Sequence, residues 1–76
     1  MSKALIRICV QVGMERKLRD SLRKLKEVKM AEITAGEQDV VAIVEAKSFE
    51  NILKVVTTKI RKNDGIKITW TNFILD

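Results

Sequence analysis

The sequence predicts a single α+β domain whose four strands and two helices follow the order β-α-β-β-α-β. Three observations support this order. Every second residue from Ala4 to Val12 is apolar, and from Met14 the apolar spacing becomes that of a helix. A continuous apolar run from Val40 to Val44 is likewise followed by helical spacing up to Ile60. Two split β-α-β units with right-handed crossovers form a four-stranded antiparallel sheet with both helices on one face. The expected architecture is therefore ferredoxin-like.

The first half of the chain contains one clear strand and one clear helix. Gly13 ends the alternating strand, and an amphipathic helix follows whose basic residues are interpreted as its solvated side. The apolar stripe of this helix consists of Met14, Leu18, Leu22 and Leu25. Residues 28–34 form a less certain strand, which we expect at an edge of the sheet.

The second half begins with an almost wholly apolar strand, in which Val40 to Val44 are five apolar residues in a row. Ser48 is expected to cap the helix that follows. The predicted buried stripe of that helix consists of Phe49, Ile52, Leu53, Val56 and Ile60. The last strand is expected from Ile66 to Leu75, with Ile66, Ile68, Trp70 and Ile74 on one of its faces and Thr69 and Thr71 on the other.

Apolar residues are predicted on both faces of the sheet, although the helices cover only one. An apolar patch on an otherwise uncovered face typically marks an interface, and stacking of two sheets is the natural way to bury it. We therefore expect the protein to dimerise through its sheet. The predicted interface residues are Leu5, Cys9, Val41, Ile43 and Trp70.

Composition excludes several classes of function. The 76 residues contain no histidine and one cysteine, and neither a metal site nor a nucleophile–base pair is visible. We expect no catalytic residue, no cofactor and no metal, so an enzyme is disfavoured. The chain lacks a signal peptide or membrane span, which indicates a cytoplasmic protein. Its net charge of +5 permits contact with nucleic acid without establishing it.

The turn at Gly36 is the most distinctive short segment. Glycine adopts a positive φ without steric cost, so the turn can be tight and its backbone amides can face outward. Glu37 and Asp39 place two carboxylates beside these amides. Amide donors and carboxylate acceptors together suit a zwitterion. The same residues are also typical of an ordinary hairpin turn.

Two segments resemble the effector domain of the Lrp/AsnC transcriptional regulators, the RAM domain for regulation of amino-acid metabolism. Thr34-Ala-Gly-Glu-Gln-Asp39, followed by an apolar strand and Glu45-Ala46, is similar to the family's Thr-Gly-x-x-Asp turn, with an extra alanine before the glycine. Gly65-Ile66-Lys67, Thr69-x-Thr71 and Phe73-Ile74-Leu75 resemble its closing strand. The resemblance covers essentially the whole chain.

The resemblance implies a dimer through stacked sheets, further assembly into a ring such as an octamer, and a small amino acid bound where dimers meet. The ligand-binding residues that it implies are Thr34, Gly36, Glu37, Gln38, Asp39, Thr69 and Thr71. The high strand propensity of threonine would by itself also explain these two residues. Trp70 is interpreted either as filling the ligand site or as strengthening an interface.

Full-length relatives carry a DNA-reading helix-turn-helix, whereas this sequence begins at the first effector strand. We therefore expect a stand-alone module without direct specific DNA binding, which modulates transcription through ligand-dependent assembly or by co-assembly with full-length relatives. Two alternatives remain. One is a structural assembly module without a ligand. The other is a weak nucleic-acid-binding protein, disfavoured because one exposed tryptophan is no stacking platform.

Overall fold

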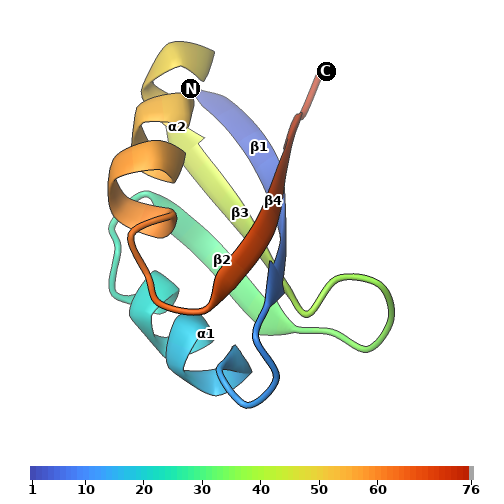
Figure 1. Cartoon of the computed structure of the whole chain (residues 1–76). Coiled ribbons are helices and arrows are strands. Elements are labelled where there is room, and N and C mark those ends of the chain that lie inside the picture. Colours follow the sequence, from blue (N-terminus) through green and yellow to red (C-terminus); the bar gives the residue numbers. More distant parts are fainter. Residues whose placement is uncertain (76) are drawn as a thin grey trace.

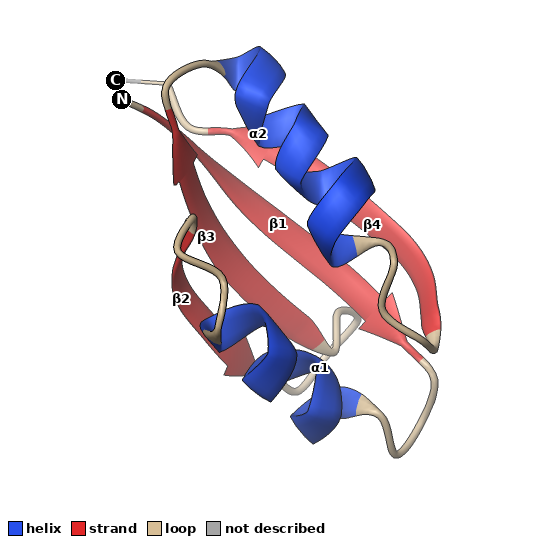
Figure 2. Cartoon of the chain, turned by 90° about the vertical axis from the view of Figure 1, so that its left-hand side faces the viewer, coloured by secondary structure: helices blue, strands red, loops and turns tan. Residues whose placement is uncertain are grey.

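The computed structural model describes residues 1–75 as a four-stranded antiparallel sheet with two helices on one face (Figures 1 and 2). The strands are β1 (Ser2–Val10), β2 (Val28–Ile33), β3 (Val40–Ala46) and β4 (Ile66–Phe73). The helices are α1 (Glu15–Arg23) and α2 (Phe49–Val55), and α2 continues into a π-helical turn, η1 (Val56–Ile60). The spatial order β2-β3-β1-β4 confirms the predicted ferredoxin-like fold.

The core lies between the helices and the two central strands. β3, and β1 from Ala4 onward, alternate strictly between buried and half-buried residues, as a strand with one covered face does. The largest fully buried side chains are Ile6, Ile8, Leu22, Val40, Val44, Ile52 and Ile60. Leu18 and Leu22 of the predicted α1 stripe are buried. Burying these aliphatic side chains is the main favourable contribution to folding.

Part of the predicted α2 stripe was wrong. Leu53 is 45% exposed, whereas Ile52, Val55 and Val56 are buried, so the buried side of the helix is centred on these three residues and leaves Leu53 at its margin. Phe49 is 38% exposed and packs against Phe73 of the edge strand β4, with ring centroids 4.3 Å apart. Phe49 therefore covers the margin of the core instead of its centre.

Side chains cap both ends of the second helix. Ser48 Oγ accepts a hydrogen bond of 3.1 Å from the Asn51 amide, which confirms the predicted N-cap. At the other end, Asn63 Nδ2 donates to the Ile60 carbonyl at 2.8 Å. Ser21 Oγ of α1 donates to Asn63 Oδ1 at 2.8 Å, so the cap also links the two helices.

Both outer ends of the β1–β4 pair differ from the prediction. β1 ends at Val10, where the Gln11 amide turns to the Gly65 carbonyl (2.7 Å), and Val12 is 87% exposed. β4 ends at Phe73 instead of Leu75. Cys9 pairs with Ile68 while Val10 pairs with Ile66, so Lys67 forms a bulge. The bulge turns Ile66 onto the core and leaves Ile68 on the opposite face.

The five predicted interface residues all lie on the uncovered sheet face, which we call the open face. Leu5 pairs with Ile43, Arg7 pairs with both Val41 and Trp70, and strand partners point to the same side. Cys9 follows Arg7 by two residues and shares its face. Trp70 is 36% exposed, and Leu5, Cys9, Val41 and Ile43 are half-buried. Whether a second molecule covers this face stays a prediction.

Candidate functional site

The β2–β3 connection, residues 34–39, projects beyond the end of the sheet (Figure 1). We call it the Gly36 loop. Gly36 has a φ of +137°, which confirms the predicted positive φ, and no atom lies within 4 Å of a Cβ built there. No residue between 1 and 75 accepts a hydrogen bond from the amides of residues 35–38. The loop therefore presents consecutive backbone donors to its surroundings.

Five polar contacts hold this loop in place, one of which is the hydrogen bond from the Asp39 amide to the Ile8 carbonyl at 3.0 Å. The Thr34 amide donates to the Asp39 carbonyl at 2.9 Å, and Thr34 Oγ1 donates to the Gln38 carbonyl at 2.8 Å. Asp39 Oδ2 accepts from the Val10 amide at 2.8 Å. Cys9 Sγ donates to the Glu37 carbonyl at 3.2 Å. Thr34 and Asp39 thus act as turn residues that shape the loop. The amides of Gly36 and Glu37 and the Glu37 carboxylate, at its exposed tip, make no hydrogen bond within residues 1–75.

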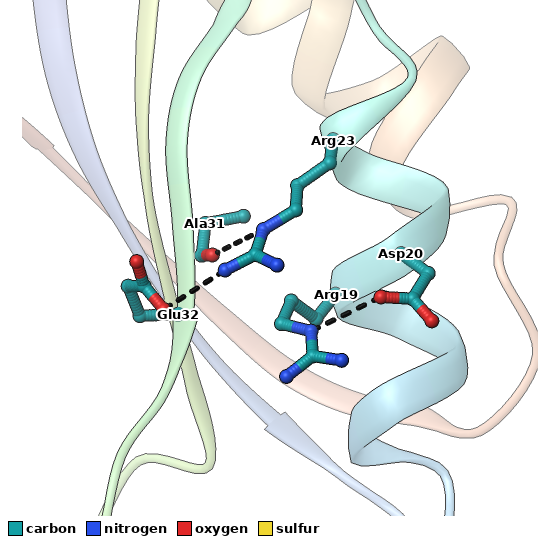
Figure 3. A network of polar contacts seen from close by, with 5 residues as sticks. All are labelled: Arg19, Asp20, Arg23, Ala31 and Glu32. Carbon is teal, nitrogen blue, oxygen red and sulfur yellow. Dashed lines mark hydrogen bonds and ion pairs between the residues drawn. The ribbon is translucent and has the colours of Figure 1, made fainter.

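An arginine of α1 braces the strand that leads into the loop (Figure 3). Arg23 Nε donates to the Ala31 carbonyl at 3.0 Å, and Nη2 pairs with Glu32 Oε1 at 2.9 Å. β2 is an edge strand, and a charged side chain over its backbone discourages pairing with another strand. Sequence reasoning had placed Arg23 only on the solvated helix face, because nothing in the helix pattern reveals a contact with a strand.

Thr69 and Thr71 lie apart from the Gly36 loop. They pair with Ile8 and Ile6, so both threonines face the helices. β4 forms one edge of the sheet, and β1 separates it from β3, where the loop ends. Two strand spacings, about 10 Å, therefore lie between β4 and the loop-bearing strand. Within one molecule, the structure brings together residues 34–39 but does not join the two threonines to them.

Trp70 contacts Arg7 on the open face. The Arg7 guanidinium lies 5.2 Å from the centroid of the Trp70 ring, within cation–π range, and Arg7 Nε donates to Asn72 Oδ1 at 3.0 Å. Phe49 and Phe73 pack together at the helix side. Trp70 is thus the one aromatic side chain of residues 1–75 on the open face, which offers no row of aromatic rings for stacking bases.

Residues 1–75 contain neither a candidate metal site nor a membrane-spanning helix. No three His, Cys, Asp or Glu side chains are grouped so that they could hold a metal ion. No helix in that range is long and apolar enough to cross a membrane.

Comparison with known proteins identifies close structural relatives. The family model for the Lrp/AsnC ligand-binding domain matches residues 3–76. The crystal structure of FFRP-DM1 is 32% identical, with a TM-score of 0.93, and the match covers 99% of this chain and all of that one. TTHA0845 from Thermus thermophilus is 26% identical, with a TM-score of 0.94 over 100% of this chain and 95% of its own.

A longer relative matches over part of its length. AsnC from Escherichia coli is 25% identical, with a TM-score of 0.91, and the match covers 99% of this chain but 51% of AsnC. No curated protein matches the chain.

Proposed function

The chain belongs to the Lrp/AsnC ligand-binding domain family, and on that premise we propose that it is a regulatory module that binds a small amino acid at the Gly36 loop. The observation that carries this proposal is the row of backbone amides at residues 35–38 that donate no hydrogen bond within residues 1–75, beside the carboxylates of Glu37 and Asp39. The amides suit the ligand's carboxylate, and a carboxylate suits its ammonium group. Glu37 is the better acceptor, because Asp39 Oδ2 already accepts from Val10.

The ligand of another protein with this fold supports an amino acid as the molecule bound here. A transcriptional regulator from Neisseria meningitidis that shares this fold, at 21% identity and a TM-score of 0.86, was solved as a complex with L-methionine. L-methionine is therefore the first amino acid to test. The proposed role is regulatory and non-catalytic, and the proposed compartment is the cytoplasm.

The proposed site is completed by a second molecule. The Gly36 loop projects from the sheet, and Thr69 and Thr71 lie on another surface, so a ligand can reach both sets only where two molecules meet. The open face is the surface proposed for the first dimer contact, since Arg23 obstructs the β2 edge. A ligand bound between dimers stabilises the assembled state, because that state offers it more contacts than a separate dimer does.

The proposed consequence for transcription is indirect. The chain spans 51% of AsnC from Escherichia coli, and it would influence such longer relatives by assembling with them, or by changing its own assembly when the amino acid binds. Regulation then depends on how much more tightly one assembly state binds the amino acid than another does, and not on contacts between this domain and DNA bases.

Native mass spectrometry tests the proposal. The purified protein is measured alone and with a mixture of common amino acids that includes L-methionine. We expect an assembly of dimers that retains one amino acid per subunit or changes its subunit number when the mixture is added. An assembly that ignores every amino acid would favour a structural module without a ligand, and a monomer under all conditions would contradict the proposed assembly.

A further inference from the structure

A groove of about 620 Å³ lies at the end of β3 remote from the Gly36 loop. It is lined by the α1–β2 connection around Lys26 and Glu27, by the last residues of β3, and by one side of α2 and η1. The seven residues of β3 separate it from the loop by about 20 Å. Its volume falls within the range of small-molecule sites, about 300–1,000 Å³.

The groove concentrates positive charge. Five lysines and two glutamates line it, an excess of three positive charges in a chain whose formal net charge is +5. The lysines are Lys26, Lys29, Lys47, Lys54 and Lys59. Of these five, Lys59 alone forms an ion pair with any of residues 1–75. Like charges gathered in a concave site raise the local concentration of anions, so we call this site the lysine groove.

Glu27 positions one lysine of the lysine groove. Its side chain is 15% exposed, and Oε2 accepts from Lys59 Nζ at 2.8 Å. Oε1 is buried and accepts no hydrogen bond from residues 1–75. The hydrogen bond from Lys59 lowers the pKa of Glu27 below 4.5, so the carboxylate is charged at neutral pH. Because Oε1 is closed off from solvent, a molecule in the groove cannot reach it, and Glu27 contributes by holding the Lys59 ammonium group in place.

The π-helical turn η1 shapes the wall that carries Lys59. The Arg61 amide donates to the Val56 carbonyl at 2.8 Å, five residues earlier, and Thr58 Oγ1 donates to the Lys54 carbonyl. Such turns are rare and are frequent at functional sites. Here the turn places Thr58 and Lys59 along the groove.

We propose that the lysine groove binds a small molecule that carries several phosphate groups, as a nucleoside triphosphate does. The phosphate oxygens accept hydrogen bonds from Lys26, Lys47 and Lys54. This site is separate from the Gly36 loop, and the inference does not rest on the proposed amino-acid binding.

Amide chemical shifts of the full chain, titrated with ATP in about 0.1 M salt, test the proposal. We expect shifts at residues 26–29, 45–47 and 51–59, and none at residues 35–38. The double variant Lys47→Glu, Lys54→Glu should weaken ATP binding at least about tenfold, since two charge-assisted contacts are lost. The matched control Lys17→Glu, Lys62→Glu changes the charge equally at exposed positions without polar partners, and should weaken binding less than about threefold.

Three results would overturn the inference. Equal weakening in the two double variants would mean that ATP responds to overall charge. Equal affinity for ATP and AMP would remove the role of the additional phosphate groups. Shifts at the groove caused by a short DNA duplex but not by ATP would assign it to a nucleic-acid backbone. ATP binding that is tighter than AMP binding, and that Lys47→Glu, Lys54→Glu weakens selectively, supports it.

Discussion

The Oδ2 atom of Asp39 accepts a 2.8 Å hydrogen bond from the backbone amide of Val10. Ile8 is the last residue of β1 that pairs with β3, so the Asp39 carboxylate takes the place of the next acceptor in the ladder. This bond fixes the start of β3 to the end of β1 and thereby sets where the Gly36 loop leaves the sheet.

Asp39→Ala should destabilise the protein by about 1–2 kcal/mol, because the Val10 amide loses a charged acceptor in a half-buried position. Asp39→Asn is the control, since its side-chain oxygen can still accept from the amide. Urea denaturation measures both. If the alanine variant were as stable as the unmodified protein, the hydrogen bond would contribute nothing to the free energy of unfolding.

The Glu27–Lys59 pair predicts a dependence of stability on pH. The hydrogen bond from Lys59 lowers the pKa of Glu27 from its ordinary 4.5 in the folded state. The unfolded chain therefore binds a proton first as the pH falls, and the stabilising contribution of Glu27 is complete above pH 4.5 and lost below it. Glu27→Gln should be less stable than the unmodified protein at pH 7, and the difference should shrink below pH 4.5. A difference that is constant with pH would contradict this account.

The open face predicts a variant that weakens assembly without damaging the core. Ile43→Lys places a charge at the centre of that face, opposite Leu5, and should convert a sheet-to-sheet dimer into monomers. Val12→Lys is the matched control, because Val12 is 87% exposed outside the face. Light scattering after size-exclusion chromatography measures the molar mass. An unchanged mass for Ile43→Lys would place the interface elsewhere.

Much of the fold could be predicted from the sequence, because in β1, α1 and β3 the residues that recur at strand or helix spacing as apolar are the residues that are buried. The same reasoning identified Ser48 as a cap and Gly36 as a residue with positive φ, since both depend on local chemistry. It failed at Ile66, where the bulge at Lys67 shifts the strand by one residue. The alternation of apolar residues in the sequence does not reveal a bulge, so Ile66 was assigned to the wrong face of the sheet.

The candidate site was only partly predictable for a similar reason. Residues 34–39 are contiguous, and their proximity follows from the chain itself. Contacts between distant segments, such as Arg7 with Trp70, depend on strand order and register, which one sequence specifies only through packing. Glu27 and Lys59 are 32 residues apart, and no local pattern indicated that they would meet in a groove.

Isothermal titration of L-methionine and the other common amino acids into Gly36→Val and Gly13→Val tests the central claim most directly. Both glycines have positive φ, +137° and +94°, with no atom within 4 Å of an added Cβ, so each substitution strains the backbone by roughly 1–3 kcal/mol without a steric clash. The account predicts that Gly36→Val abolishes or strongly weakens amino-acid binding, whereas Gly13→Val retains the affinity of the unmodified protein. Undiminished binding by Gly36→Val would contradict a site built on this loop.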